Sequence, residues 1–503
     1  MSGFGEFLKN AAIAGFKRKN ASSNSGNTIA LCGDSITHNN FRQSTITGIS
    51  RTNNVVTVTL SSAATTGPGL PVQVVGVPED MRGNQVVTGV SGNTFTYANV
   101  GPDVASGSLG SNPRVANMSS YVDVGIFVWT NILSNQKFDI VAVSASTGRY
   151  SAEALARISE IISAAPARCW VMIGTNDCGA AESTISMASI QANIIAIWTA
   201  LLSAGIEVIA CTIPPQSAPS WNATLAARVN ILNEWIRTNA KLTNGVRLVD
   251  IYARMVDPMN ANKGTAKTGY MIAGDGLHPS PRGCYYAGKG AAADLADIPQ
   301  VDLRTTNNGD NYGTNSANRN LLDSAPWTNT GGGIAGTATG TTGANWTCQG
   351  NGSAVVNCTP TLRSDGFGYD HVVTAKAQAN GDTFYLYGGG SIVPRLPAAP
   401  FSLRLLQTVS VSGMQAANYT VLNTYMPMTL GGVTNRNIEA LGGTGSSAAE
   451  AVDEDWTGVI ATPKIAFSSV RPTTLSIYNQ PINVGASANT ATFRYGRASL
   501  LWS

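Results

Sequence analysis

The stretch CWVMIGTND, residues 169–177, joins a short apolar run to a polar turn, and this pattern indicates the fold of the chain. Four further runs of the same kind are present: TIALC (28–32), FDIVAV (138–143), IEVIA (206–210) and VRLVDI (246–251). Short, uninterrupted apolar runs rich in β-branched residues are typical of strands that are buried on both faces of a sheet.

Longer segments with the helical period separate these runs. Apolar residues recur at spacings of three and four in residues 151–165, 185–205 and 223–242. Strands that alternate with helices predict an α/β fold, with a central parallel sheet between two layers of helices. In such sheets ligands bind beyond the carboxyl ends of the strands.

Two regions follow a different pattern, in which apolar and polar residues alternate and the turns are rich in Gly, Pro and Asn. Residues 44–112 predict a small antiparallel β domain inserted after the first strand. Residues 321–503 predict a β-sandwich of the jelly-roll type. The expected order is therefore a docking helix and linker (1–27), the α/β domain (28–297) that carries the insertion, a linker (298–320) and the sandwich, and we expect the sandwich to be separable from the α/β domain.

Composition excludes several classes of protein. Of the 503 residues only 12% are charged and the formal charge is +3, which does not favour binding to nucleic acid. No apolar run reaches the roughly 20 residues of a membrane span, and the N-terminus does not resemble a secretory signal, so we expect no membrane insertion. No His, Cys or carboxylate cluster has metal-ligand spacing, and we expect neither a metal nor a cofactor.

Some features allow two readings. Cys348 and Cys358 are close enough in sequence to close a loop, and whether they pair is left open. The acidic stretch at 450–456 fits a solvated loop better than a calcium site. The glycine-rich stretch at 330–343 lacks the Lys-Ser/Thr and the strand-to-helix context of a phosphate loop, which favours a flexible surface stretch.

Three polar segments follow predicted strands and could carry chemistry: GDSI (33–36), GTND (174–177) and DGLHP (275–279). A serine hydroxyl becomes a nucleophile only beside a base, which a third group must hold in one tautomer. Of the three histidines, His278 is the better base for Ser35, because His38 shares the turn of Ser35 and His371 lies in the C-terminal region. Asp275 precedes His278 by three residues and could hold its ring. Each segment alone has a structural reading, such as a helix cap for Ser35 or an ordinary turn for GTND.

Acyl transfer also needs hydrogen-bond donors for the developing oxyanion. Asn176, at the end of a predicted strand, has a side-chain amide, and Gly148, in VSASTGRY (143–150), offers an unobstructed backbone N–H. With the backbone N–H of Ser35 they would supply three donors.

These segments, in this order, resemble the four signature blocks of the SGNH (GDSL-type) hydrolase superfamily, over residues 28–297 without the insertion. The resemblance implies that Ser35 attacks an ester carbonyl, that His278 acts as general base and then as general acid, and that Asp275 orients His278. It further implies an oxyanion hole formed by Ser35, Gly148 and Asn176. The insertion beside Ser35 is atypical of the family.

The architecture of a hydrolase with two added β domains resembles that of bacteriophage tailspike and tail-fibre carbohydrate esterases. This resemblance implies a virion protein of the phage tail that removes O-acetyl groups from a bacterial surface polysaccharide. It also implies a homotrimer whose N-terminus contacts other tail proteins. Four aromatic residues are candidate sugar platforms, although the core is the more common place for each: Trp346, Tyr385, Tyr387 and Trp456.

Two other functions stay open. One is a lipase or thioesterase of the same superfamily, although no long apolar lid segment is visible in the sequence. The other is a virion protein that binds a receptor without catalysis, against which the intact Ser, Asn, Asp and His residues argue.

Overall fold

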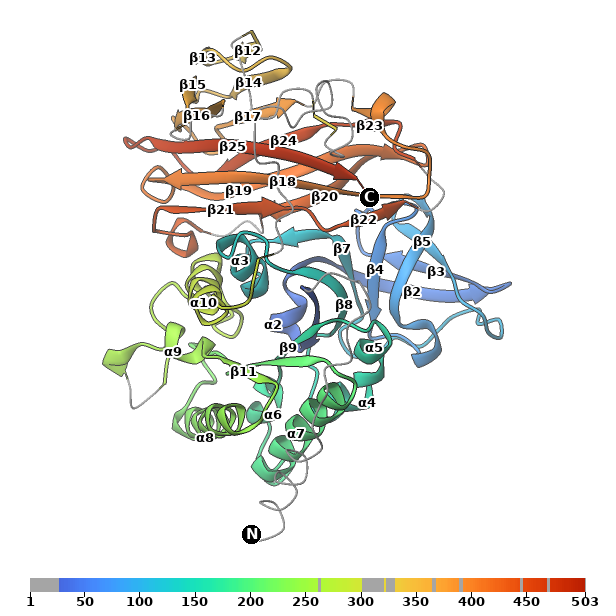
Figure 1. Cartoon of the computed structure of the whole chain (residues 1–503). Helices are drawn as coiled ribbons and strands as arrows, with labels where there is room; N and C mark the ends of the chain where they lie inside the picture. Colours follow the sequence, from blue (N-terminus) through green and yellow to red (C-terminus); the bar gives the residue numbers. More distant parts are fainter. Residues whose placement is uncertain are drawn as a thin grey trace. The chain divides into compact units, whose positions relative to one another are not determined.

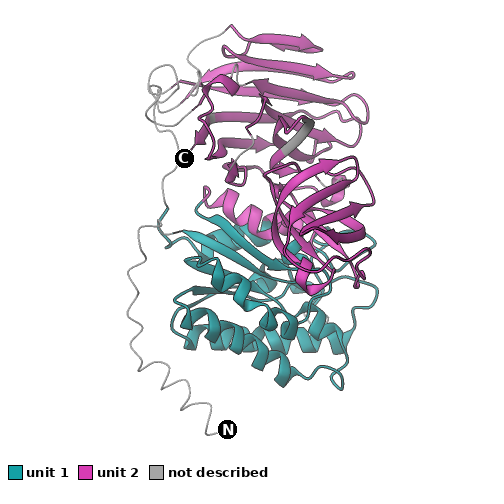
Figure 2. Ribbon diagram, turned by 90° about the vertical axis from the view of Figure 1, so that its right-hand side faces the viewer, with its two compact units in different colours: residues 1–38, 137–278, 286–301 teal, residues 39–136, 279–285, 302–503 magenta. Residues whose placement is uncertain are grey.

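The structure is a computed structural model that describes residues 27–260, 264–300, 321–322, 331–363, 368–388, 392–443, 447–467 and 471–502. The predicted docking helix and nearly all of the predicted linker at 298–320 lie outside these residues. The chain divides into two compact units. The first unit contains residues 1–38, 137–278 and 286–301, and the second contains residues 39–136, 279–285 and 302–503, in teal and magenta in Figure 2.

A five-stranded parallel sheet forms the centre of the first unit (Figure 1). Each of the five apolar runs identified in the sequence contributes one strand, in the order β11-β10-β9-β1-β8. The registers between neighbours are all parallel. The strands are β1 (Thr28–Gly33), β8 (Asp139–Ala145), β9 (Arg168–Met172), β10 (Glu207–Cys211) and β11 (Val246–Val249).

The two long helices of this unit, α7 and α8, begin at side-chain caps and bury apolar residues. Ser186 accepts a hydrogen bond from the Ser189 N–H, and Asn222 accepts one from the Leu225 N–H. Apolar residues of the two long helices, among them Ile194, Trp198 and Leu232, pack into one core cluster with alternate strand residues. The helices are α4 (Ser151–Ala156), α5 (Ile158–Ser163), α6 (Thr175–Gly179), α7 (Met187–Ser203), α8 (Ala223–Leu242), α9 (Ile251–Met255) and α10 (Pro281–Asp294), whose first turn belongs to the second unit.

One helix prediction needs correction. Residues 151–165 form two short helices, α4 and α5, rather than one. The chain bends at Arg157, where φ is −112°, outside the helical range. Arg157 forms an ion pair with Glu160, so its side chain is fixed at the bend.

The predicted insertion at 44–112, together with flanking residues from Phe41 to Val122, forms a closed β-barrel in the second unit. The strand order is β7-β2-β3-β6-β5-β4, and β4 pairs again with β7. The interior is filled by a cluster that includes Val58, Val74, Phe95 and Tyr97. Closure leaves no free sheet edge, which a simple antiparallel insertion would have. The strands are β2 (Phe41–Thr52), β3 (Val55–Leu60), β4 (Pro71–Val75), β5 (Gly83–Ser91), β6 (Thr94–Ala98) and β7 (Arg114–Val122).

The C-terminal strands form two facing sheets. One contains β16 (Tyr369–Lys376), β25 (Ala491–Trp502), β18 (Phe401–Ser412) and β21 (Trp456–Ala461) in that order. The other contains β17 (Thr383–Gly388), β24 (Ile477–Asn483), β19 (Tyr419–Leu430) and β20 (Val433–Gly442). Counted along the chain, this is the strand order of a jelly roll. Phe493 of one sheet contacts Phe384 and Tyr419 of the other, with ring centroids 5.3 and 5.4 Å apart.

Shorter strands extend these sheets at their edges: β12 (Gly333–Gly336), β13 (Ala338–Gly340), β14 (Trp346–Asn351), β15 (Val355–Leu362), β22 (Ile465–Phe467) and β23 (Thr474–Leu475). The described part of the glycine-rich stretch at 330–343 therefore supplies two strands rather than an irregular surface segment.

The barrel and the jelly roll belong to one unit because they share a sheet. β7 pairs in parallel with β20, and the Arg42 guanidinium binds both carboxylate oxygens of Glu439, at 2.7 and 2.8 Å. Helix α3 (Ile126–Leu133) also contacts the jelly roll, since the Trp129 and Trp456 rings meet edge to face at 5.2 Å. Residues 39–136 thus pack with residues 302–503, a division that differs from the linear order expected from the sequence.

The structure shows the surroundings of the cysteines, of the acidic stretch at 450–456 and of two candidate aromatic residues. All seven cysteines are buried and none forms a disulfide, although Cys348 raises the pKa of the Cys358 thiol through a hydrogen bond. In the acidic stretch, Asp455 accepts a hydrogen bond from the Gly413 N–H and Asp453 forms an ion pair with Arg282. Trp346 and Trp456 are buried in the core. None of the helices within the described ranges is both long and apolar enough to cross a membrane.

Candidate functional site

Ser35 lies directly beyond the carboxyl end of β1, as the first residue of the short helix α2 (Ser35–His38). The chain can turn here because residue 33 is glycine: a Cβ atom would lie 2.1 Å from the Thr37 Oγ1 and 2.5 Å from the Met172 carbonyl oxygen. The Asp34 carboxylate accepts a hydrogen bond from the Ile36 N–H at 3.0 Å and fixes the turn. Ser35 is buried, with 6% of its surface exposed.

The imidazole of His278 bridges Ser35 and Asp275. Its Nε2 lies 2.8 Å from the Ser35 Oγ, and its Nδ1 lies 2.6 Å from the Asp275 Oδ2. The second oxygen of Asp275 accepts the Leu277 N–H at 3.0 Å, which fixes the carboxylate. The structure therefore brings together the serine, the imidazole and the carboxylate that the sequence singled out, in the order that a Ser-His-Asp triad requires.

The loop that carries Asp275 and His278 is held tightly. The Ile272 N–H donates to the His278 carbonyl at 3.0 Å. Gly276 has φ of +65°, and a Cβ atom there would lie 2.4 Å from the Ala218 nitrogen. A glycine is thus needed between the two functional residues, which explains why this loop reads Asp-Gly-Leu-His.

The other two predicted residues follow the strands that flank β1. β8 and β9 pair with β1 on opposite sides, and Gly148 follows β8 while Asn176 follows β9 in α6. The Asn176 Nδ2 donates to the Arg149 carbonyl oxygen at 3.0 Å. One hydrogen of this amide is therefore committed to the neighbouring loop, and the second is left for an oxyanion. Gly148 has φ of +76°, a conformation that favours glycine.

Two further residues, Asp177 and Arg149, support these loops. The Asp177 carboxylate accepts hydrogen bonds from the backbone N–H of Ser151, at 3.0 Å, and from its hydroxyl, at 2.5 Å. The buried Arg149 guanidinium donates to the Ser144 Oγ at 3.1 Å, and burial lowers its pKa to about 10. Asp177 could have been suspected, because it follows Asn176 and an acid there can cap the predicted helix that begins at 151.

The carboxyl group of Asp34, the residue before Ser35, has an unusual environment. Asp34 is fully buried, and burial raises the pKa of its carboxyl to about 6, although the Ile36 N–H, Thr175 and His278 oppose this shift. The protonation of Asp34 therefore changes between pH 4 and 7, beside the candidate nucleophile.

The other two histidines do not compete for the role of base. His38 is fully buried in α2, and His371 belongs to the second unit. The His371 Nε2 accepts a hydrogen bond from the Gly343 N–H at 2.7 Å, and burial lowers its pKa to about 3. His371 is thus a neutral histidine of the core.

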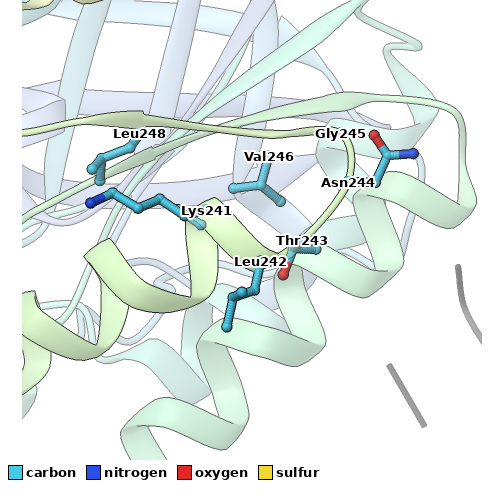
Figure 3. A pocket seen from close by; sticks show the side chains of 8 residues that line it. Lys241, Leu242, Thr243, Asn244, Gly245, Val246 and Leu248 are labelled. Carbon is cyan, nitrogen blue, oxygen red and sulfur yellow. The ribbon is translucent and has the colours of Figure 1, made fainter. Parts of the chain in front are cut away.

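A separate hollow lies at the opposite edge of the sheet. Its volume is about 470 Å³, and residues 240–246 and 248, from the end of α8 into β11, line it (Figure 3). Since Ser35 lies at the carboxyl ends of the strands and Val246 begins β11, this hollow is not part of the candidate site. Among the described residues, no three metal-ligating side chains lie together.

Comparison with known proteins gives a family match for one part of the chain. Residues 123–284 match the model of the GDSL-like Lipase/Acylhydrolase family. The matched segment contains Gly148, Asn176, Asp275 and His278 but not Ser35, which the barrel separates from the rest. A search of curated proteins gave no match.

Solved structures with similar folds include three hydrolases. The lipase/acylhydrolase from Enterococcus faecalis is 16% identical and covers 55% of this chain and 100% of its own, with a TM-score of 0.31. A catalytic mutant of an acetylxylan esterase from Geobacillus stearothermophilus is 14% identical and covers 55% of this chain and 97% of its own, with a TM-score of 0.32. A GDSL-like lipase from Bacteroides thetaiotaomicron is 25% identical and covers 31% of this chain and 74% of its own, with a TM-score of 0.26.

Proposed function

We propose that this chain is a serine esterase of the GDSL-like acylhydrolase type with Ser35 as its nucleophile, and the match of residues 123–284 to that family's model supports the proposal. The observation that carries the proposal is the continuous hydrogen-bonded chain from the Ser35 Oγ through the His278 ring to Asp275, with contacts of 2.8 and 2.6 Å. A serine in an ordinary helix cap would have no such partner.

The reaction follows from this chain of contacts. His278 Nε2 takes the proton of Ser35 as the Oγ attacks the ester carbonyl, and Asp275 stabilises the resulting imidazolium through Nδ1–H. The oxyanion would accept hydrogen bonds from the backbone N–H groups of Ser35 and Gly148 and from the Asn176 amide. His278 then gives its proton to the leaving alcohol oxygen. Water, deprotonated by the same imidazole, attacks the acyl-serine and releases the acid.

We further propose that the substrate is an O-acetylated polysaccharide of a bacterial surface, and that the chain is a phage tailspike. The low charge of the chain and its large share of β-structure support this assignment. The jelly roll and the barrel share a sheet, and on this proposal that β-structure supports contact with a long polymer. On this proposal residues 1–27 bind other tail proteins and the chain forms a homotrimer.

The two alternative functions make different predictions. A lipase or thioesterase would prefer long acyl chains over acetyl. A non-catalytic receptor-binding protein would release no acid from any ester. The Ser35, His278 and Asp275 contacts favour catalysis over the second alternative, because a binding module has no need of an oriented imidazole.

The deciding experiment measures acid release by the full chain and by Ser35→Ala from p-nitrophenyl acetate, p-nitrophenyl palmitate, acetylated xylan and O-acetylated capsules. We expect acetate release from the acetyl esters and a loss of about 10³-fold or more in Ser35→Ala. Ser163→Ala, which changes an exposed serine on α5, is the matched control and should retain full activity. Release from the palmitate alone would support a lipase, and no release at all would support a receptor-binding protein.

A further inference from the structure

One face of the jelly roll carries tyrosines on three adjacent strands. Tyr385 and Tyr387 on β17, Tyr478 on β24 and Tyr425 on β19 are all partly exposed. Their neighbours along the strands, such as Phe384 and Leu386, are fully buried, so the tyrosines lie on the outer face of the sheet. We call this surface the tyrosine face and define it by the four tyrosines and Gln480.

The register of the strands aligns these side chains in two rows. Tyr387 pairs with Tyr478 and Tyr478 with Tyr425, which forms a row of three rings across the sheet. The next row, two residues further along, places Asn423 opposite Gln480, and Gln349 of β14 opposite Tyr385. The face therefore presents a line of three aromatic rings beside a line that contains three amides and Tyr385.

The rings of the first row are stacked but offset. The centroids of Tyr387 and Tyr478 are 5.0 Å apart at an interplanar angle of 9°, and those of Tyr425 and Tyr478 are 5.5 Å apart at 19°. Carbon atoms in contact are about 3.5–4 Å apart, so parallel rings at these separations are displaced sideways. Each ring thus leaves part of its surface uncovered by the next.

The second row holds the rings in place and adds polar groups. The Gln480 Nε2 donates to the Tyr385 hydroxyl at 3.1 Å, and the Tyr425 hydroxyl donates to the Gln480 Oε1 at 3.3 Å. An amide fixed at both ends keeps the tyrosines in one arrangement, which lowers the entropy lost on binding.

The tyrosine face is also uncharged. Burial raises the pKa of Tyr425 to about 12, so its hydroxyl stays protonated at neutral pH. The carboxylate of Glu439, next to Tyr425 in the register, accepts hydrogen bonds from the Nε and Nη2 of the Arg42 guanidinium. A ligand that fits this surface has C–H groups for the rings and hydroxyl or acyl oxygens for the amides, without ionic groups.

We propose that the tyrosine face binds a neutral, O-acetylated stretch of the polysaccharide. This inference rests on the proposed function, since it assigns a second contact to the same polymer. Pyranose rings offer C–H faces and equatorial hydroxyls together, which matches a row of rings beside a row of amides. An interface between copies of this chain is less favoured, because such interfaces have a largely apolar core and this face has an amide or hydroxyl at every second position.

The test uses the Ser35→Ala chain, which leaves acetyl groups in place. Its affinity is measured by calorimetry and on an array of acetylated xylan, acetylated glucomannan and O-acetylated capsules. We expect binding to at least one neutral acetylated glycan, weakened about tenfold by Tyr478→Ala or Tyr387→Ala and largely restored by Tyr478→Phe. Tyr369→Ala, on the other sheet at β16, is the matched control and should bind normally.

Three results would overturn the proposal. The first is that the chain binds no glycan, and the second is that folded alanine variants bind as well as the Ser35→Ala chain. The third is a fall in the oligomeric mass of Tyr478→Ala in light scattering, which would indicate an interface between copies. Hydrolysis of p-nitrophenyl acetate by Tyr478→Ala with Ser35 intact separates the two proposals. We expect the rate of this hydrolysis to be the same as in the unaltered chain. If the esterase proposal were wrong, the unaltered chain would not hydrolyse p-nitrophenyl acetate either.

Discussion

The Asp177 carboxylate holds the first residue of α4, Ser151, through both its backbone N–H and its hydroxyl. Asp177 follows Asn176 in α6, and Ser151 follows the loop of Gly148 and Arg149. The Asn176 amide binds the carbonyl of that same loop at 3.0 Å. Two adjacent residues of α6 thus fix the loop that carries the candidate donor Gly148, so that the loop cannot move independently of Asn176.

Asp177→Asn should therefore lower kcat about tenfold while KM changes little. An asparagine has only one acceptor oxygen for two donors of Ser151, and its NH2 group would face the Ser151 N–H. The loss of a buried hydrogen bond costs about 1–3 kcal/mol of stability, so thermal unfolding is measured beside kinetics. Ser151→Ala, which keeps the backbone contact, should have a smaller effect on kcat. A normal kcat in a destabilised Asp177→Asn chain would show that the residue is structural only.

Asn176→Ala tests the oxyanion hole itself. Loss of one such donor typically lowers kcat by about 10²–10³-fold, because the contact strengthens only in the transition state. KM should change by much less. Asn222→Ala is a matched control: it removes the cap of α8, which costs about 1 kcal/mol of stability without an effect on kcat. If both variants lost activity in proportion to stability, Asn176 would not be a donor.

The buried Asp34 predicts a dependence of stability on pH. Its pKa is about 6 in the native state and 3.8 when exposed, so the native state binds this proton more tightly than the unfolded state does. Stability from this group is present below pH 4 and is lost as the pH rises through about 6. Compared with Asp34→Asn, the unaltered chain should lose up to about 3 kcal/mol of stability between pH 4 and 7.

Urea unfolding of both chains at several pH values in this range measures the difference. Groups that titrate in both chains cancel in the comparison, so only Asp34 and residues coupled to it contribute. Unfolding midpoints that shift in parallel for the two chains would contradict the raised pKa.

The parallel sheet could be predicted from the sequence because its strands are buried on both faces and read as unbroken apolar runs. The site could be predicted because the carboxyl ends of parallel strands meet at one edge, so that Ser35 and Asn176 follow neighbouring strands in space. The structure also explains why residues 33 and 276 are glycines, because a Cβ atom at either position would collide with the backbone.

The barrel and its attachment could not be predicted in the same way. Alternation in residues 44–112 indicates strands but not that β4 pairs again with β7, because closure depends on contacts between strands far apart in the sequence. The pairing of β7 with β20 joins positions more than 300 residues apart, which no local pattern records. Likewise, Tyr385 and Tyr387 alternate visibly with core residues, whereas their alignment with Tyr478 and Tyr425 depends on the register of three strands.

The shared sheet changes the expectation for truncation. Removal of residues 321–503 takes away β20, the partner of β7, together with Glu439, which binds Arg42, and Trp456, which contacts Trp129. It also removes the Ala451 carbonyl that accepts the Arg282 guanidinium, four residues after His278. Exposure of a large buried side chain costs about 1.5–3 kcal/mol, and several are exposed together. We therefore expect the truncated chain to lose the fold of residues 39–136 and 279–285, and to lose hydrolysis of p-nitrophenyl acetate.

A milder variant tests the same contacts without truncation. Trp456→Ala should lower the unfolding temperature, since Trp129 packs edge to face on Trp456 and on Tyr285 of the segment that follows His278. Tyr478→Ala, on the outer face of the same jelly roll, should leave p-nitrophenyl acetate hydrolysis intact. Activity and near-ultraviolet circular dichroism are measured for the truncated chain, Trp456→Ala and Tyr478→Ala. If the truncated chain kept its aromatic dichroism and hydrolysed p-nitrophenyl acetate at the normal rate, the jelly roll would be separable. The triad would then not depend on the sheet that contains β7 and β20.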